Sequence, residues 1–166
     1  MSSTPAVAAL TRAGIAHEVH RYRHDPRSTY FGDEAVTAMT EALGVDARQI
    51  FKTLVVETAP SGGGRAGLAV AIVPVPHKLS LKAMAAALGV PKVTMAPADR
   101  VTRSTGYVLG GVSPLGQKQR LPTVLDSSAL DWPIVLCSAG RRGLEVSLAP
   151  ADLREATGAS VAPLRA

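Results

Sequence analysis

Lys52 is the residue of this chain whose type and position are best suited to chemistry at a substrate. It stands near the start of an apolar stretch, Ile50 to Val56, with the composition of a buried strand. A lysine there can extend its aliphatic stem to water, which would leave it without a chemical role. The alternative is an ammonium held at the mouth of a pocket, where it neutralises a phosphate or polarises a developing oxyanion.

A glycine-rich segment, Gly106 to Gly116, is the second candidate. Its glycines interrupt an apolar stretch and permit the backbone to approach a ligand closely. Hydroxyl residues and the nearby Lys118 and Arg120 would let the segment line a narrow polar pocket with exposed amide donors. The competing interpretation is an ordinary strand between two turns. The segment contains no Gly-x-Ser-x-Gly nucleophile motif.

Two adjacent arginines, Arg141 and Arg142, form the third candidate. The stretch 138–143 around them predicts a hairpin turn, and the two guanidinium groups are equally suited to bind phosphates. The chain has 18 Lys and Arg residues against 13 Asp and Glu residues. This basic balance favours a polyanionic partner.

Thiol and metal chemistry are disfavoured. Cys137 is the single cysteine, which excludes an internal disulfide and a multi-cysteine zinc site, and its apolar neighbours predict a buried strand residue. His17 and His20 fall on opposite faces of a predicted strand, and His24 lies beyond it. We therefore expect neither a metal nor a cofactor.

Periodicity and capping signals predict the elements that must position these residues. Predicted helices cover 5–13, 33–43, 81–88, 97–103 and 150–156. Predicted strands cover 15–22, 52–58, 68–75, 92–96, 123–125, 134–138 and 144–148, with a flexible hairpin connection at 60–64. No repeat or linker divides the chain, so we expect one domain over 1–166, with a mixed sheet or barrel in preference to a regular parallel sheet.

A cytoplasmic protein without membrane association is expected. The longest apolar run, Gly67 to Val75, is about half the roughly 20 residues that a bilayer span needs. The N-terminus shows no basic segment followed by a long apolar stretch, as a secretory signal would.

Seven strings of residues run in order over nearly the whole chain and form a specific pattern. They are Tyr22 to Pro26, Phe31 to Glu34, Phe51 to Leu54, Arg103 to Tyr107, Gly110 to Lys118, Arg120 to Thr123 and Arg142 to Leu144. In these strings the sequence resembles the YbaK-type aminoacyl-tRNA deacylases, and most of all the free-standing Cys-tRNA(Pro) deacylases. One departure is Glu145, which stands where that family has an aspartate.

The resemblance implies an α/β protein of the α+β type, with a mixed, mostly antiparallel, barrel-like β-sheet surrounded by helices. It implies a pocket for the aminoacylated 3′ end of tRNA, with Lys52 as the catalytic residue. The substrate-binding residues it implies are Tyr22, Phe31, Thr53, Gly110, Gly111, Ser113, Pro114, Ser138 and Glu145. Lys118, Arg120, Arg141 and Arg142 are the expected contacts to tRNA phosphates.

The expected function is trans-editing hydrolysis of mischarged Cys-tRNA(Pro), with prolyl-tRNA synthetase as a transient partner. No convincing nucleophile, base or metal site occurs in the sequence, but a cysteinyl ester carries its own thiol, whose pKa of about 8.5 leaves a few per cent as thiolate near neutrality. Two alternatives stay open. One is an Ala-tRNA(Pro) or broader aminoacyl-tRNA deacylase that uses water, and the other is a non-catalytic module that binds tRNA or a synthetase.

Overall fold

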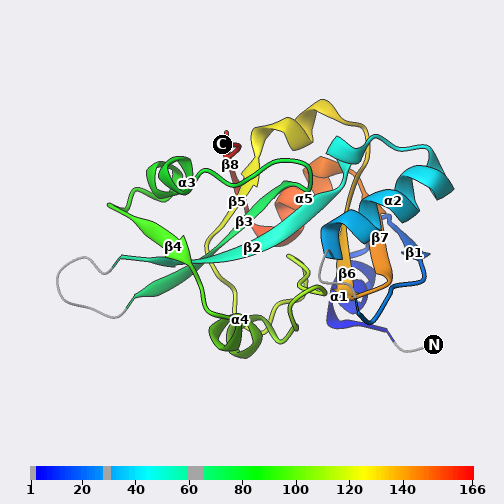
Figure 1. The fold of residues 1–166 in the computed structure, drawn as a ribbon, viewed down its shortest axis with the longest axis horizontal. Coiled ribbons are helices and arrows are strands. Elements are labelled where there is room, and N and C mark those ends of the chain that lie inside the picture. The colour runs from blue at the N-terminus through cyan, green and yellow to red at the C-terminus, as the bar shows by residue number, and fades with distance from the viewer. Residues whose placement is uncertain (1–2, 28–30, 60–65) are drawn as a thin grey trace.

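The computed structural model of the protein describes residues 3–27, 31–59 and 66–166 (Figure 1). The helices are α1 (Pro5–Ala13), α2 (Phe31–Leu43), η1 (Ala47–Gln49), α3 (Leu81–Leu88), α4 (Ala98–Thr105), η2 (Ser127–Asp131) and α5 (Pro150–Thr157), where η marks a 3-10 helix. The strands are β1 (Glu18–Arg21), β2 (Phe51–Thr58), β3 (Gly67–Pro74), β4 (Val93–Met95), β5 (Thr123–Asp126), β6 (Val135–Arg141), β7 (Leu144–Leu148) and β8 (Ser160–Ala162).

Side-chain caps fix several helix starts. The hydroxyl of Thr4 accepts a hydrogen bond from the amide of Val7 at the start of α1, and Ser80 accepts one from the amide of Ala83 in α3. Asp46 begins η1 with a capping box. The predicted helices are all confirmed, with boundaries that differ by at most two residues.

The strands form two sheets. The larger has the order β4-β2-β3-β5-β8, in which β2 pairs antiparallel with β3 and β4, whereas β5 pairs parallel with β3 and β8. The smaller has the order β1-β7-β6 and is antiparallel throughout. The α+β class and the mostly antiparallel pairing are therefore confirmed. The described strands form no closed barrel; the sheets meet instead at a parallel bridge between Ile50 and Leu136.

Both faces of β2 are buried. Phe51 and Val55 point into a cluster that also holds residues of α1, β5, β6 and β7, while Val56 packs with Met84 of α3 in a second cluster. A strand buried on both faces needs a nearly continuous hydrophobic run, as the sequence of β2 shows. Lys52 interrupts that run. It is the second residue of β2, where the side chain can reach the end of the sheet.

Some elements differ from the sequence prediction. Strand β1 begins at Glu18 instead of Ile15, because the amide of Ile15 donates to Leu10 and completes the end of α1. The sequence did not reveal η2 or β8, which are short and carry weak signals. The predicted hairpin connection at 60–64 lies outside the described residues, although the antiparallel pairing of β2 with β3 agrees with it.

Residues 106–118, called the glycine loop below, leave α4 and reach α1. Gly116 lies against the backbone of α1, where a Cβ atom would stand 2.4 Å from the carbonyl oxygen of Pro5. The hydroxyl of Tyr107 donates to the carbonyl of Leu115 at 2.7 Å and ties the two ends of the loop together. The loop is therefore held by the core of the fold.

The contact of Gly116 predicts a large loss of stability in Gly116→Ala. Gly44 provides a matched control, since its φ of 69° resembles the 63° of Gly116 but no atom lies within 4 Å of its Cβ position. We expect Gly44→Ala to cost about 1 kcal/mol for the left-handed backbone alone. Gly116→Ala should cost roughly 3 kcal/mol, because the backbone of α1 must also move. Urea unfolding measures both, and equal losses would contradict the close contact.

Candidate functional site

A cavity of about 390 Å³ lies where the two sheets meet α2 and the glycine loop. Its lining residues come from seven segments of the chain. They are Tyr22 after β1; Gly32, Asp33 and Ala35 of α2; Phe51, Lys52, Thr53 and Leu54 of β2 with Val75 after β3; Leu109, Gly110 and Val112 of the glycine loop; and Ser138 and Glu145 of β6 and β7.

The bridge between the sheets sets the base of this cavity. Ile50 and Leu136 are paired in parallel, and beyond them β2 and β6 continue into different sheets. Two residues further along each strand stand Lys52 and Ser138, and both line the cavity. The divergence of two strands thus creates the space into which these side chains reach.

Lys52 is a half-buried cation at the edge of the cavity. Its Nζ atom donates to the carbonyl oxygen of Val75 at 3.3 Å. Burial lowers the pKa of Lys52, the carboxylate of Asp33 opposes this shift, and Lys78 adds to it. Because the ammonium is already partly desolvated, it attracts an anionic group in the cavity more strongly than a surface lysine would.

Glu145 is the buried acid of the site. It lies on β7 between Ser138 of β6 and His20 of β1, and only 5% of it is exposed. Its Oε2 atom has no hydrogen-bond partner among the described residues. Burial raises the pKa of Glu145 to about 8, so the carboxyl group holds its proton at neutral pH. A cation bound beside it would favour loss of that proton.

Polar groups surround Glu145. The amide of Tyr22 donates to the carbonyl of Gly143 at 2.9 Å, which fixes the tyrosine at the cavity. Burial raises the pKa of Tyr22, and the neighbouring Glu145 raises it further. Ser138 accepts a hydrogen bond from the amide of Gly140 at 3.1 Å. The hydroxyl of Thr53 is buried without a partner among the described residues, so it is available to a ligand.

Gly110 and Val112 of the glycine loop line the cavity. The amides of Gly110 and Val112 make no hydrogen bond to any described residue, whereas the amide of Gly111 donates to the carbonyl of Val108 at 3.0 Å. Gly111 packs against the turn between β6 and β7, where a Cβ atom would stand 2.6 Å from the Cα of Arg141. Gly111 is therefore a packing position, whereas Gly110 and Val112 are lining residues whose amides have no partner among the described residues.

The structure brings six of the site residues proposed from the sequence into one cavity. They are Tyr22, Lys52, Thr53, Gly110, Ser138 and Glu145. Ser113 and Pro114 are buried within the glycine loop away from the cavity, and the hydroxyl of Ser113 accepts from the amide of Leu115 at 3.2 Å. Phe31 begins α2, and its side chain lies outside the described part of the chain.

The four predicted phosphate contacts are not among the residues that line the cavity. Lys118, Arg120 and Arg141 are exposed. The guanidinium of Arg120 rests beside Gly158 at the end of α5. Arg142 is half-buried and close enough to Tyr22 to oppose the rise of its pKa. Through this effect on Tyr22, Arg142 acts electrostatically on a residue that lines the cavity.

Sequence reasoning missed several lining residues. Asp33 lies in a string that carries the family resemblance, but neither Asp33 nor Val75 was assigned a role, because that role depends on the approach of α2 to the end of β3. In that approach Gly32 comes so close that a Cβ atom would stand 2.9 Å from the Cγ1 of Val75. Leu109 and Val112 resembled the apolar filler of a strand. Both lie within the glycine-rich segment that the sequence singled out, but no local signal set them apart from its other apolar residues.

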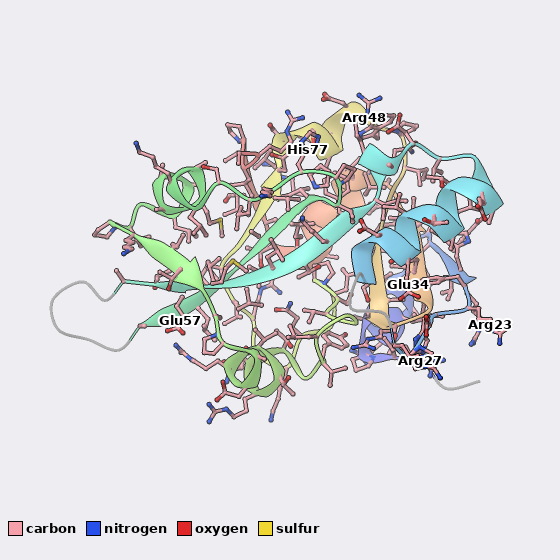
Figure 2. The ribbon with its side chains drawn as sticks, in the orientation of Figure 1. Arg23, Arg27, Glu34, Arg48, Glu57 and His77 are labelled. Atoms are coloured by element: carbon pink, nitrogen blue, oxygen red, sulfur yellow. The ribbon has the colours of Figure 1, made fainter. Side chains whose placement is uncertain are left out.

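A second hollow, of about 570 Å³, lies at α4. It is lined by Arg100, Arg103, Ser104 and Gln119, together with Ala66 and Leu68. Arg100 forms an ion pair of 2.9 Å with Glu57. Figure 2 shows Glu57 on the side of the sheet where α4 lies. This hollow is larger and basic, but it holds neither a buried acid nor an amide-bearing glycine wall. The smaller cavity is therefore the candidate reaction site.

The cavity supports catalysis by positioning and electrostatics. Its described lining contains no histidine or cysteine. Cys137 is fully buried, and burial raises the pKa of its thiol, so it is not a nucleophile. What the site offers is a cation, two amide donors and a protonated acid around one space. None of the described helices combines the length and apolar character that a membrane crossing requires.

Comparison with known proteins identifies the family that this chain resembles. Residues 34–156 match the family of aminoacyl-tRNA editing domains. A protein of Enterococcus faecalis, provisionally named Cys-tRNA(Pro)/Cys-tRNA(Cys) deacylase EbsC, is 36% identical over 127 residues, which cover 76% of this chain and 74% of that protein.

Solved structures show the same fold. The crystal structure of a trans-editing enzyme, provisionally assigned to prolyl-tRNA synthetase, has a TM-score of 0.78 and 30% identity over 100% of this chain and 99% of that chain. The crystal structure of hypothetical protein APE2540 has a TM-score of 0.80 and 26% identity over 98% of this chain and all of that chain. The likeness therefore extends over both sheets.

The raised pKa of Glu145 predicts an unusual pH dependence of stability. Between its ordinary value of 4.5 and about 8, the folded protein keeps a proton that the unfolded chain loses. The free energy of unfolding should therefore fall by about 1.4 kcal/mol per pH unit as the pH rises through this window. Glu145→Gln should remove this slope, whereas Glu41→Gln, an exposed control on α2, should keep it. Unfolding curves at pH 5.5, 7 and 8.5 measure the slopes, and the idea fails if wild type and Glu145→Gln run parallel.

Proposed function

Because the chain belongs to the family of aminoacyl-tRNA editing domains, we propose that it is a trans-editing deacylase whose substrate is mischarged Cys-tRNA(Pro). The name of the Enterococcus relative points to cysteinyl esters, and that of the solved relative points to prolyl-tRNA synthetase. We place the reaction in the cytoplasm, where tRNA is charged and used.

The observation that carries the proposal is a cavity equipped to hold an ester but without an activated nucleophile among its described lining residues. The described lining provides Lys52, free amides and a protonated Glu145, and it contains no histidine to activate a hydroxyl. A cysteinyl ester supplies the missing group, because its thiol is already partly ionised near neutrality. Holding that thiol beside the carbonyl gains rate from proximity alone.

The proposed step is an intramolecular acyl transfer. The cysteinyl sulfur attacks the carbonyl carbon of its own ester, and the bond from that carbon to the ribose oxygen breaks. The ribose oxygen takes up a proton and leaves as the hydroxyl of free tRNA. The acyl group departs as a cyclic thioester that water then opens. A seryl ester lacks this route, because its hydroxyl is far less acidic than a thiol.

In this proposal the residues of the protein orient the ester and stabilise the charge that develops on it. Lys52 binds the phosphate or the ester oxygen of the terminal nucleotide, and the amides of Gly110 and Val112 bind the oxyanion that develops on the carbonyl. Glu145 faces the α-amino group of the aminoacyl moiety, since a buried acid releases its proton most readily beside an ammonium. Thr53 and Ser138 offer hydroxyl groups to the rest of the aminoacyl group.

Basic residues outside the cavity serve the tRNA backbone in this proposal. Lys118, Arg120, Arg141 and Arg142 bind phosphates, as do the arginines of the hollow at α4. Such contacts bind any tRNA alike, so the choice of tRNA(Pro) falls to a transient complex with prolyl-tRNA synthetase.

Removing the cation of the cavity should abolish most turnover. We expect Lys52→Ala to lower kcat/KM for Cys-tRNA(Pro) deacylation by about a hundredfold or more, the usual effect of losing one oxyanion-stabilising group. Lys82→Ala is the control, since Lys82 is exposed on α3. Release of labelled cysteine measures both variants. Turnover of Lys52→Ala within twofold of wild type would exclude the role given to this lysine.

A panel of esters on one tRNA tests the use of the substrate's thiol. Cys-tRNA(Pro) should be deacylated faster than Ser-tRNA(Pro) by more than the factor of about 10 to 200 that pocket size can provide. The seryl ester is the matched control, because it differs from the cysteinyl ester only by oxygen in place of sulfur. The alanyl ester has no side-chain nucleophile and shows how much hydrolysis occurs without one. Comparable release of serine and cysteine would instead indicate attack by water.

A further inference from the structure

Two large apolar side chains are exposed at the mouth of the cavity. Val108 is 61% exposed and Leu109 is 48% exposed, although apolar side chains of this size are commonly buried. Leu109 also lines the cavity, so its exposed surface continues directly from the reaction site to the solvent.

This apolar pair is held in a fixed position. Residues 108–111 form a tight turn in which the amide of Gly111 donates to the carbonyl of Val108 at 3.0 Å and Gly110 has a φ of 90°. That combination is typical of a type II turn, in which Leu109 occupies the outer corner. Gly111 is pressed against the backbone of Arg141, which anchors the turn to the β6–β7 hairpin.

The chemistry of the proposed substrate indicates which part of it lies beside Leu109. An aminoacyl ester is carried on the ribose of the terminal adenosine of tRNA. If the carbonyl carbon lies at the amides of Gly110 and Val112, the ribose and its adenine leave the cavity beside the neighbouring residue, Leu109. A purine base has flat apolar faces, and single-stranded bases gain affinity by stacking on such side chains.

We propose that Leu109, with Val108 beside it, forms the binding surface for the terminal adenine of the tRNA. The surface sets the position of the ribose relative to Lys52 and so presents the ester to the amides. This inference rests on the proposed function, because it takes the aminoacyl ester as the ligand of the cavity. Leu109 is a substrate-binding residue in this scheme and takes no part in proton or acyl transfer.

The test compares substrates with and without the nucleoside. Leu109→Ala should raise KM for Cys-tRNA(Pro) about tenfold with little change in kcat, as expected when one leucine side chain loses its burial against the ligand. Leu109→Phe should lower KM severalfold, because an aromatic ring stacks better on a base. With cysteine methyl ester, which carries no nucleoside, Leu109→Ala should lower kcat/KM by a much smaller factor than with Cys-tRNA(Pro). Leu130→Ala is the control, since Leu130 on η2 is similarly exposed, at 45%, but does not line the cavity.

A binding measurement separates this inference from the proposed function. Calorimetric titration with adenosine 5′-monophosphate requires no turnover, and its affinity should fall about tenfold in Leu109→Ala. Ribose 5-phosphate, which lacks the base, should bind wild type and variant equally. Equal affinity of both proteins for adenosine 5′-monophosphate overturns the inference, as does an equal loss with cysteine methyl ester. If wild type releases no cysteine from Cys-tRNA(Pro) but shows the adenosine 5′-monophosphate difference, the proposed function fails and the base-binding surface stands.

Discussion

The parallel bridge between Ile50 and Leu136 is the constraint on which the site depends. It joins two sheets at one point and then lets their strands diverge, so that residues immediately beyond it face a common space. Lys52 and Ser138 occupy equivalent places on the two diverging strands, and Glu145 is the cross-strand neighbour of Ser138. The cation and the acid of the site therefore owe their proximity to backbone pairing, and neither needs the other as an ion-pair partner.

Local signals in the sequence were sufficient for most of the elements. Thr4 before Pro5 and Ser80 before Leu81 mark helix starts that the structure confirms. The apolar run of β2 marks a strand buried on both faces. Lys52 was conspicuous for the same reason, because a charge within such a run must lie near an opening. The family followed from strings of residues spread over the chain, and similarity to known editing domains bears it out.

Tertiary packing explains what the sequence could not show. The close contact of Gly111 with Arg141 arises only when the glycine loop meets the β6–β7 turn, so the paired glycines could not be assigned separate roles in advance. The same holds for Asp33, whose charge acts on Lys52 because α2 lies over the end of β3. The raised pKa of Glu145 is likewise a property of its burial, which no residue type encodes.

If the protein has the proposed function, the contact of Gly116 with the backbone of α1 has a consequence for the accuracy of translation. Because Gly116 packs on the backbone of α1, this end of the loop should come loose only when α1 does, and the cavity wall beside it should melt together with the domain. Proofreading that depends on this wall would then be lost abruptly, together with the fold, and would not decline gradually under mild heat. In a cell under thermal stress, cysteine misincorporation at proline codons would consequently rise as a threshold event.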